Sequence, residues 1–395
     1  MNICILGRQS KLGLAELEQR YGSKRVQPIG DGYALVDADV AIDTIGGTVK
    51  VASLLTTLAT ANPQKIFDYC RRELPRHAAM KPDGKIQLGV SLYGFDLPIA
   101  KITANVLGLK KAIKLSGRSV RAIPNTTAAL SSAQTYHNHL TGPMGIELVF
   151  VRSGNKTYLG KVIGVQNIDA YAARDQARPK TDAFVGMLPP KLALMMLNLS
   201  GVASSSTNTS DVTAGHTILD PFCGTGVVLQ EAALRGFNVY GTDLSEKMVD
   251  YSRINLQWLI DTFSLNTKVT IHHGDAIETT WQPPLSAIVA ETYLGQPFSA
   301  PPAADKLAKV RRICDDIISK FLLNLAPQIE KGTPLCLAVP AWRDERGRVT
   351  DLELLDNIKK LGYDWQPLQH VKHSDLLYFR DDQIVARQLL VLRKL

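Results

Sequence analysis

The chain of 395 residues has few cysteines and no long apolar run. Its five cysteines, Cys4, Cys70, Cys223, Cys314 and Cys336, are scattered and form no C-x-x-C pair. A disulfide framework or a zinc cluster is therefore not expected, and a reducing compartment fits better. No apolar stretch is long enough to span a bilayer. The first residues lack the basic segment of a signal peptide. We expect a cytoplasmic protein with no membrane partner.

Several catalytic and metal-binding patterns are also absent. The sequence has no G-x-x-x-x-G-K-[ST] loop, and no Ser/His/Asp constellation stands out. The pairs His272–His273 and His370/His373 have no third ligand nearby, so we expect them to be surface or packing residues and expect no metal. The length predicts two or three domains, and the hydrophobic content of 45% supplies a core without disulfides.

Acidic residues are missing from one long window of the chain. Between Asp96 and Glu147 there is no aspartate or glutamate. The basic residues of this window are Lys101, Lys110, Lys111, Lys114, Arg118 and Arg121. A solvated helix face that happens to be basic would explain them. We favour contact with RNA or DNA, because the charges cluster in a chain whose net charge is +8.

The first 165 residues have the pattern of α+β units. Residues 2–7 and 32–38 read as strands on either side of a helix at 11–22. The order in residues 63–165 is helix, strand, helix, strand, helix and hairpin, and the strand at 85–94 alternates as a half-buried strand does. Residues 177–201 begin as a loop and become a helix from Pro189–Pro190. The polar stretch 202–216 reads as a flexible surface loop.

From residue 217 strands and helices alternate. Strands are expected at 217–220, 238–243, 269–276 and 287–291, with helices at 226–236 and 245–260 between them. This alternation predicts an α/β domain with a mostly parallel, doubly wound sheet. The last 21 residues read as a hairpin, so a final antiparallel strand is expected. The segment W-Q-P-P at 281–284 reads as a turn.

A glycine loop follows the first strand of this domain. The strand ends at Asp220, and Gly224 and Gly226 lead into a helix whose first N–H groups are unpaired. Small residues there let a ligand approach the backbone. An NAD-type loop would need a small residue three positions after the second glycine, and that place holds Leu229. A dinucleotide site is therefore excluded, and Cys223 is taken as part of the loop.

The next two strands also end in carboxylates. Asp243 ends the second strand, where an acid can accept hydrogen bonds from both hydroxyls of a ribose. Asp275 and Ala276 follow the third, where a carboxylate and a backbone N–H can bind the edge of an adenine. Each residue alone could be a cap or a turn. Three such features in order predict a nucleoside-containing cofactor.

These motifs resemble class I S-adenosylmethionine-dependent methyltransferases. The segment D-P-F-C-G-T-G at 220–226 resembles the first motif of amino-methyltransferases that act on exocyclic amines of bases. Together with residues 5–18, the THUMP-like order of the middle unit and the segment 178–201, it resembles the THUMP-domain tRNA guanosine N2-methyltransferases that act at position ten. The resemblance covers nearly the whole chain, and its most specific parts are 220–226 and G-M-L-P-P-K-L-A at 186–193.

The resemblance implies a domain order and a set of cofactor-binding residues. It implies a ferredoxin-like α+β domain at 1–55, a THUMP-like RNA-binding domain at 56–168 and a methyltransferase domain at 169–395, with tRNA gripped by the first two. Asp220, Phe222, Gly224 and Gly226 would line the methionine end of S-adenosylmethionine. Asp243 would hold the ribose, and Asp275 and Ala276 the adenine. Arg178 and Pro179 would lie in the segment that covers the cofactor.

The fourth motif departs from the family pattern. The family has Asp or Asn, two prolines and an aromatic residue, where the acid orients the target amine and the aromatic stacks on a flipped base. This chain has E-T-Y-L-G at 291–295, so both prolines are absent and Tyr293 stands one position early. Glu291 and Tyr293 are the expected catalytic residues of a working variant. The alternatives are a methyltransferase for DNA adenine or ribosomal RNA guanine, and a non-catalytic tRNA-binding protein.

Overall fold

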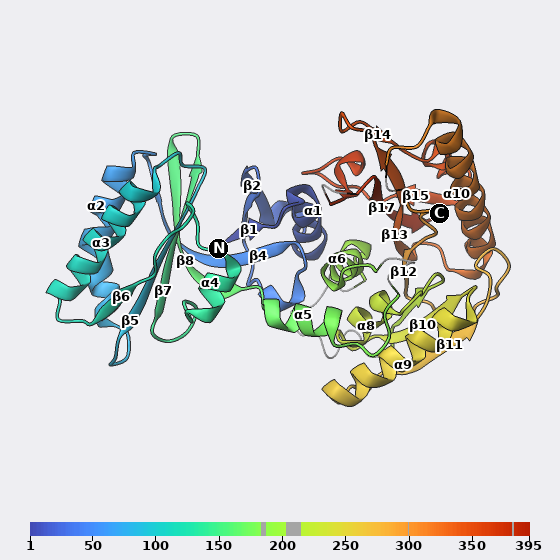
Figure 1. Cartoon of the computed structure of the whole chain (residues 1–395), viewed down its shortest axis with the longest axis horizontal. Helices are drawn as coiled ribbons and strands as arrows, with labels where there is room; N and C mark the ends of the chain where they lie inside the picture. Colours follow the sequence, from blue (N-terminus) through green and yellow to red (C-terminus); the bar gives the residue numbers. More distant parts are fainter. Residues whose placement is uncertain (183–186, 203–214, 299, 381–382) are drawn as a thin grey trace. The chain divides into compact units, whose positions relative to one another are not determined.

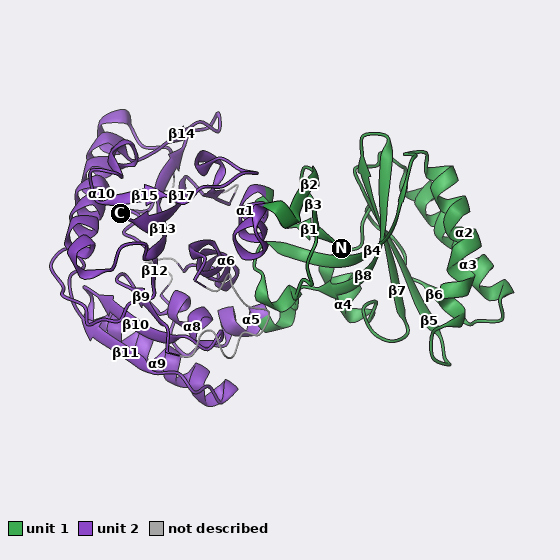
Figure 2. Cartoon of the chain, turned by 180° about the vertical axis from the view of Figure 1, so that it is seen from behind, with its two compact units in different colours: residues 1–10, 24–170 green, residues 11–23, 171–395 purple. Residues whose placement is uncertain are grey.

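The computed structural model describes residues 1–182, 187–202, 215–298, 300–380 and 383–395. The chain divides into two compact units (Figure 2). Unit 1 comprises residues 1–10 and 24–170, and unit 2 comprises residues 11–23 and 171–395. A single sheet runs through residues 2–165 of unit 1, so the division of this part at residues 55/56 and the three-domain order stay predictions.

Unit 1 is built on an eight-stranded sheet of order β2-β3-β1-β4-β8-β7-β5-β6 (Figure 1). Its strands are β1 Asn2–Leu6, β2 Val26–Gly30, β3 Tyr33–Val36, β4 Thr48–Leu58, β5 Ile86–Tyr93, β6 Val120–Ala122, β7 Gly145–Ser153 and β8 Lys156–Val165. The helices of this part of the chain are α1 Ser10–Tyr21, α2 Pro63–Ala79, α3 Ile99–Leu115, α4 Ser132–His137 and α5 Ile168–Gln176, of which α1 and α5 cross the unit boundary.

Helices α2 and α3 lie side by side and pack their apolar sides on the β5–β7 part of this sheet (Figure 1). The predicted order of residues 63–165 is confirmed. The prediction that residues 85–94 form a half-buried strand is wrong, because six of the eight residues of β5 are buried, on both faces of the strand. The second face is covered by the segment before β7, where Ser91 Oγ accepts from the Leu130 N–H at 2.9 Å and Leu92 N–H donates to Ala128 at 3.0 Å.

Unit 2 contains the predicted parallel sheet. Its strands are β9 Thr217–Asp220, β10 Asn238–Asp243, β11 Val269–His273, β12 Ala287–Glu291, β13 Pro334–Arg343, β14 Val349–Thr350, β15 Tyr363–Trp365, β16 Leu377–Tyr378 and β17 Val385–Lys394. Its helices are α6 Pro190–Ser200, α8 Val227–Ala233, α9 Glu246–Phe263 and α10 Ala304–Leu325. Short 3-10 helices of the chain are Ser23–Arg25, Ile42–Thr44, Ala326–Gln328, Glu353–Asn357 and His373–Asp375.

The main path of this sheet is β11-β10-β9-β12-β13-β17-β15. Strands β9 to β13 pair in parallel, and β17 pairs antiparallel with both β13 and β15, which confirms the predicted final antiparallel strand. Helices α6, α8 and α9 cover one face of the sheet. Helix α10 covers the other, where its apolar residues pack on Ile288, Ala290, Leu335 and Leu337.

Local signals explain where two helices of unit 2 begin and end. Helix α6 begins at Pro190, as predicted, because proline at a first helical position lacks only an N–H that would be unpaired there. It ends at Gly201, whose φ of 79° is the left-handed conformation that favours glycine. Helix α8 begins after Gly226, whose φ is 83°.

Three further predictions concern composition. The five cysteines are buried thiols. No helix in the described ranges has both the length and the apolar character that a membrane span requires. The surface loop expected at 202–216 falls mostly on residues 203–214, outside the described residues.

Candidate active site

Three predicted acids end neighbouring strands of the parallel sheet. Asp243, Asp220 and Glu291 are the last residues of β10, β9 and β12, which lie next to one another in that order. The chain runs outward from β9 in both directions, so the β9/β12 boundary is the point where the strand order reverses (Figure 2). Open α/β sheets bind ligands at this point, beyond the carboxyl ends of the strands.

The glycine loop between β9 and α8 needs glycine for two different reasons. Gly226 has a φ of 83°, and a Cβ there would lie 2.9 Å from Ser252 Oγ. Gly224 has a φ of 51°, and a Cβ there would meet nothing closer than Phe222 O at 4.0 Å. Packing against Ser252 therefore requires glycine at position 226. At position 224 the space that a side chain would fill is open to a ligand.

Two polar residues of α9 hold this loop, and sequence reasoning missed both. Ser252 Oγ donates to Gly224 O at 2.8 Å, and Asn255 Nδ2 donates to Thr225 O at 2.9 Å. Both side chains belong to fully buried residues. The available signal was a serine and an asparagine three positions apart among the apolar residues of the predicted helix, a spacing that places both on one face.

Asn255 also connects the loop to the segment that contains Arg178. Asn255 Nδ2 donates to Lys180 O, and its Oδ1 accepts from Lys180 N–H, both at 2.9 Å. This two-point contact brings residues 178–180 beside the glycine loop. Pro179, between Arg178 and Lys180, is exposed.

The Arg178 side chain is enclosed. Its Nη2 donates to Asp175 Oδ1 at 3.0 Å and contacts Met187 Sδ at 3.0 Å. Its Nε and Nη1 are buried and have no hydrogen-bond partner among the residues that the structure describes. Buried guanidinium N–H groups without acceptors are unfavourable, so this residue fits an anionic ligand group.

Asp243 is held by two backbone donors. Its Oδ2 accepts from Gly224 N–H and its Oδ1 accepts from Ser245 N–H, both at 2.9 Å. Burial raises the pKa of Asp243, and the two N–H groups and His273 partly offset this shift. Each carboxylate oxygen keeps a second lone pair, so the group can accept further hydrogen bonds from two hydroxyls.

Asp220 is the most deeply buried of the three acids, with 2% of its surface exposed. Its Oδ1 accepts from Phe222 N–H at 3.1 Å. Burial raises the pKa of Asp220 well above its ordinary value, and the charges of Asp243 and Glu291 raise it further. Asp220 therefore lies close enough to Asp243 and to Glu291 to feel both charges, and a positively charged ligand beside Asp220 would be stabilised.

The turn after β11 positions Asp275 and Ala276. Asp275 Oδ1 accepts from Ile277 N–H at 3.1 Å, and Asp275 O accepts from Thr279 N–H at 2.8 Å. Ala276 is buried, and its carbonyl oxygen accepts from Asn324 Nδ2 of α10 at 3.1 Å. The structure thus fixes the backbone of both predicted adenine-binding residues.

The loop after β12 is a fixed turn. Both the N–H and the Oγ1 of Thr292 donate to Ala338 O, at 2.9 and 3.1 Å. Gly295 has a φ of 79°, and a Cβ there would lie 2.8 Å from Val310 Cγ1. Between them Tyr293 is 44% exposed. The turn therefore presents the Tyr293 ring to solvent next to the strand-end acids.

Glu291 has a partner that the sequence did not predict. Arg387 Nε donates to Glu291 Oε1, and the two side chains are 10% and 19% exposed. Arg387 lies on β17, opposite Pro340 of β13. The only sequence signal was an arginine within the apolar run of the last strand. This ion pair leaves Glu291 Oε2 as a potential acceptor.

The six basic residues of the acid-free window do not share one environment. Lys101, Lys111, Lys114 and Arg121 are exposed, and Lys110 is half-buried. Arg118 is half-buried and holds the chain after α2, because its Nη1 donates to Lys81 O at 2.8 Å and its Nη2 donates to Pro82 O.

Positive charge is concentrated in unit 1. This unit holds 19 lysines and arginines against 10 aspartates and glutamates, whereas the whole chain holds 45 against 37. The excess of nine positive charges in unit 1 accounts for the whole net charge of +8, so unit 2 is close to neutral.

Two smaller predictions can be compared with the structure. In the described part of the chain, no group of three His, Cys, Asp or Glu side chains could hold a metal ion. The W-Q-P-P segment has no regular structure, but Trp281 is more than a turn residue. It is 2% exposed, and its Nε1 donates to Thr242 Oγ1 at 3.2 Å, so it packs beneath the site.

Comparisons with known proteins agree with this geometry. Residues 178–275 match the family described as RMKL-like, methyltransferase domain. The tRNA (guanine(10)-N2)-dimethyltransferase of Methanothermobacter thermautotrophicus is 36% identical over 172 residues, which cover 43% of this chain and 44% of that protein. The protein of the same name from Pyrococcus abyssi is 44% identical over 71 residues, 18% of each chain. This chain therefore matches less than half the length of these relatives.

A solved structure matches over a longer range. The crystal structure of TrmN from Thermus thermophilus has a TM-score of 0.51 and 17% identity, and the match covers 100% of this chain and 99% of that chain. At this identity the likeness concerns the fold alone. It confirms the predicted α/β fold, and the sequence matches confirm the predicted resemblance to tRNA guanosine N2-methyltransferases.

Proposed function

We propose that this chain is an S-adenosylmethionine-dependent tRNA (guanine-N2-)-methyltransferase of the position-ten type. The match of residues 178–275 to the RMKL-like methyltransferase domain family supports this proposal. The observation that carries the proposal is the meeting of the open glycine loop, Asp243 and Glu291 at the strand-order reversal of the sheet. The tRNA substrate follows from the names of the relatives.

The residues at this place fit the cofactor. Gly224 offers an open backbone, and Asp220, Phe222 and Gly226 complete the wall that would line the methionine end. Arg178 Nε and Nη1, which have no partner among the described residues, would bind its carboxylate, with the exposed Pro179 next to Arg178 in the chain. Asp243 would accept the ribose hydroxyls, and Asp275 and Ala276 would bind the adenine. When bound, S-adenosylmethionine supplies a methyl group on a positively charged sulfur.

Glu291 would orient the target amine. Arg387 fixes its Oε1, so Oε2 can accept an N–H of the guanine amine and direct the nitrogen lone pair at the methyl carbon. Bound S-adenosylmethionine would supply the methyl group for a direct displacement by this nitrogen, and the amine would release a proton to solvent. No covalent enzyme intermediate is needed, and burial raises the pKa of the Cys223 thiol, which does not favour a nucleophilic thiolate.

Tyr293 would hold the flipped base. Its ring is exposed beside Glu291 and offers a stacking surface for a base turned out of its helix. The family's two prolines are replaced by Thr292, whose two hydrogen bonds to Ala338 fix the turn in another way.

Unit 1 would bind the tRNA. Its excess of positive charge and the exposed Lys101, Lys111, Lys114 and Arg121 support this role. The proposed set of RNA-binding residues also includes Lys110 and Arg118, which are half-buried. Within unit 1 we propose a ferredoxin-like domain followed by a THUMP-like domain. Both come before the methyltransferase domain at 169–395 in the chain. The buried thiols support a cytoplasmic location.

The ion pair also favours a second candidate, a non-catalytic tRNA-binding protein. Glu291 Oε1 is already occupied by Arg387, so the acid could be purely structural. Methyl transfer separates the two. The protein is incubated with labelled S-adenosylmethionine and unmodified tRNA, with duplex DNA and ribosomal RNA in parallel. The proposal predicts label in tRNA that is lost in Glu291→Ala; binding of tRNA and cofactor without label would support the second candidate.

A further inference from the structure

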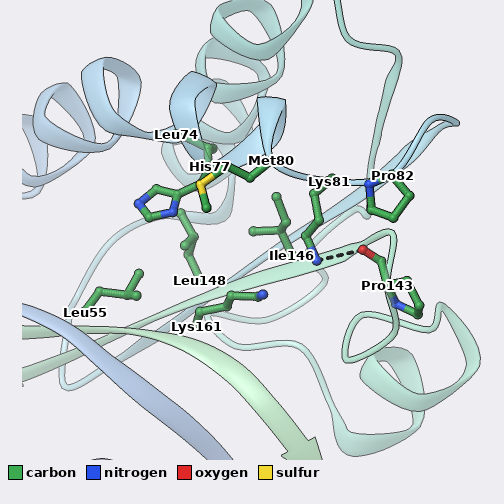
Figure 3. Close-up of a pocket in the computed structure, with 10 residues that line it drawn as sticks. All are labelled: Leu55, Leu74, His77, Met80, Lys81, Pro82, Pro143, Ile146, Leu148 and Lys161. Atoms are coloured by element: carbon green, nitrogen blue, oxygen red, sulfur yellow. Dashed lines mark hydrogen bonds between the residues drawn. The ribbon is translucent and has the colours of Figure 1, made fainter.

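Unit 1 has a pocket of about 370 Å³ beside the C-terminal end of α2 (Figure 3). Its apolar wall comes from Leu74 of α2 and from Ile146 and Leu148 of β7, which are all buried. Leu55 and the exposed Met80 lie at its rim. The residues that line the pocket all belong to unit 1, whereas the strand-end acids belong to unit 2.

Two lysines meet in this pocket. Lys81 Nζ donates to Pro143 O at 2.7 Å. The Lys161 side chain extends from β8 into the same pocket (Figure 3). Burial and, after it, the charge of the neighbouring Lys161 lower the pKa of Lys81 to about 8. Two neighbouring ammonium groups repel each other, and an anion between them would relieve that repulsion.

The residues that line the pocket do not neutralise the pair. Among those described, the third ionisable group is His77, and no aspartate or glutamate is included. The buried Leu74, Ile146 and Leu148 form one side of the pocket, and a charge interaction beside such an apolar wall is less screened than in bulk water.

The backbone of the pocket is held in place from outside. The carbonyl oxygens of Lys81 and Pro82 accept hydrogen bonds from Arg118, and Lys81 N–H donates to Ala78 O at 3.2 Å. Lys161 is fixed by the pairing of β8 with β7, opposite Leu148. The two ammonium groups are therefore brought together by rigid elements before any ligand binds.

We propose that this pocket is a binding site for a phosphate oxyanion, with Lys81 and Lys161 as its two ligands. The phosphate belongs to the RNA backbone, a statement that rests on the proposed function and on the excess of positive charge in unit 1. The apolar wall would contact the attached ribose or base. Arg118, which holds the Lys81 and Pro82 carbonyls, would also shape this pocket.

The test compares two double variants of equal charge. Lys81→Gln/Lys161→Gln removes the pair, and Lys85→Gln/Lys156→Gln removes two exposed lysines of the same unit outside the pocket. Affinity for tRNA is measured at several salt concentrations, and binding of inorganic phosphate is measured by calorimetry. Lys81→Arg/Lys161→Arg keeps both charges and should keep binding, and circular dichroism checks that each variant is folded.

If the pocket binds a backbone phosphate, Lys81→Gln/Lys161→Gln should lose roughly tenfold more affinity for tRNA than the control variant. Its affinity should also depend less steeply on salt, by about one to two released ions. If only inorganic phosphate binding is lost, the site takes free phosphate instead. Equal tRNA affinities for the two variants, with no difference in phosphate binding, would overturn the inference. If wild-type protein binds no tRNA, the proposed function fails, and the phosphate titration still decides this site.

Discussion

Arg387 Nε donates a hydrogen bond to Glu291 Oε1, and this ion pair joins β17 to the end of β12 across β13. The two residues are 96 positions apart in the chain. Because one carboxylate oxygen is fixed, the other has a defined direction. The pair therefore offers a physical replacement for the rigid prolines that are absent from the fourth motif.

Replacing Arg387 should impair catalysis more than binding. Arg387→Met removes the group that orients Glu291, so we expect kcat to fall about 10–100-fold while the KM for tRNA changes little. Arg387→Lys keeps the charge and should recover part of the rate. Arg393→Met, six residues along the same strand, is the control, because Arg393 is exposed and its partners are Gln366 and the Gly332 carbonyl, not Glu291. Equal rates for Arg387→Met and the control would contradict the positioning role.

Replacing Tyr293 should affect the substrate without affecting the fold. The ring is 44% exposed, so Tyr293→Ala should change the free energy of unfolding by less than about 0.5 kcal/mol. Loss of base stacking, worth about 1–3 kcal/mol, should lower kcat/KM for tRNA by about 10–100-fold. Tyr293→Phe keeps the stacking surface and should keep activity. If the alanine variant methylates tRNA at the wild-type rate, the ring does not hold the base.

The buried Asp220 should make stability depend on pH. Since burial raises its pKa in the folded protein, the carboxyl group favours folding fully only below about pH 4, and this contribution is lost as pH rises toward the folded pKa. Asparagine is uncharged at every pH, so Asp220→Asn cannot lose this contribution. Without cofactor, the difference in free energy of unfolding between the variant and wild type should shift in favour of the variant as pH rises above about 4.

Urea unfolding of both proteins at several pH values between 4 and 8 measures this difference. Asp261→Asn, on the exposed side of α9, serves as the matched control. A difference between Asp220→Asn and wild type that does not change with pH would show that the Asp220 carboxyl is not destabilised by burial.

Unit 1 contains a buried ion pair between β4 and β7, and removing only one of its two charges should be strongly destabilising. Lys50 Nζ donates to Glu147 Oε1 at 2.5 Å, with both side chains at most 1% exposed. Lys50→Met leaves the carboxylate buried and unpaired, which should cost about 3–5 kcal/mol. Lys50→Met/Glu147→Gln removes both charges and should recover most of this loss. Thermal unfolding followed by circular dichroism tests it, and an unstable double variant would contradict the explanation.

Most of the fold could be predicted from local patterns. Helices α3 and α9 and strands β9 to β12 follow from apolar spacing, glycines and prolines. Strands β2 and β4 were missed, and β5 was judged half-buried. The covering of β5 on both faces depends on a segment that packs back on it, which no pattern within residues 85–94 could reveal.

The sequence predicted the site residues that end strands. It did not predict the partners of those residues that come from distant elements. Asp220, Asp243 and Glu291 meet because parallel strands end at one edge of a sheet. Arg387, Ser252 and Asn255 act through contacts that depend on strand order and on how α9 packs. The Lys81–Lys161 pair likewise joins the end of α2 to β8, 80 positions later in the chain.

The most direct test of the account is to locate the methyl group on tRNA. Two transcripts that differ only in guanine or adenine at position ten are incubated with the protein and S-adenosylmethionine, then digested and analysed by mass spectrometry. The account predicts N2-methylated guanosine from the first transcript only. No methylated nucleoside from either transcript, or an equal yield from both, would contradict it.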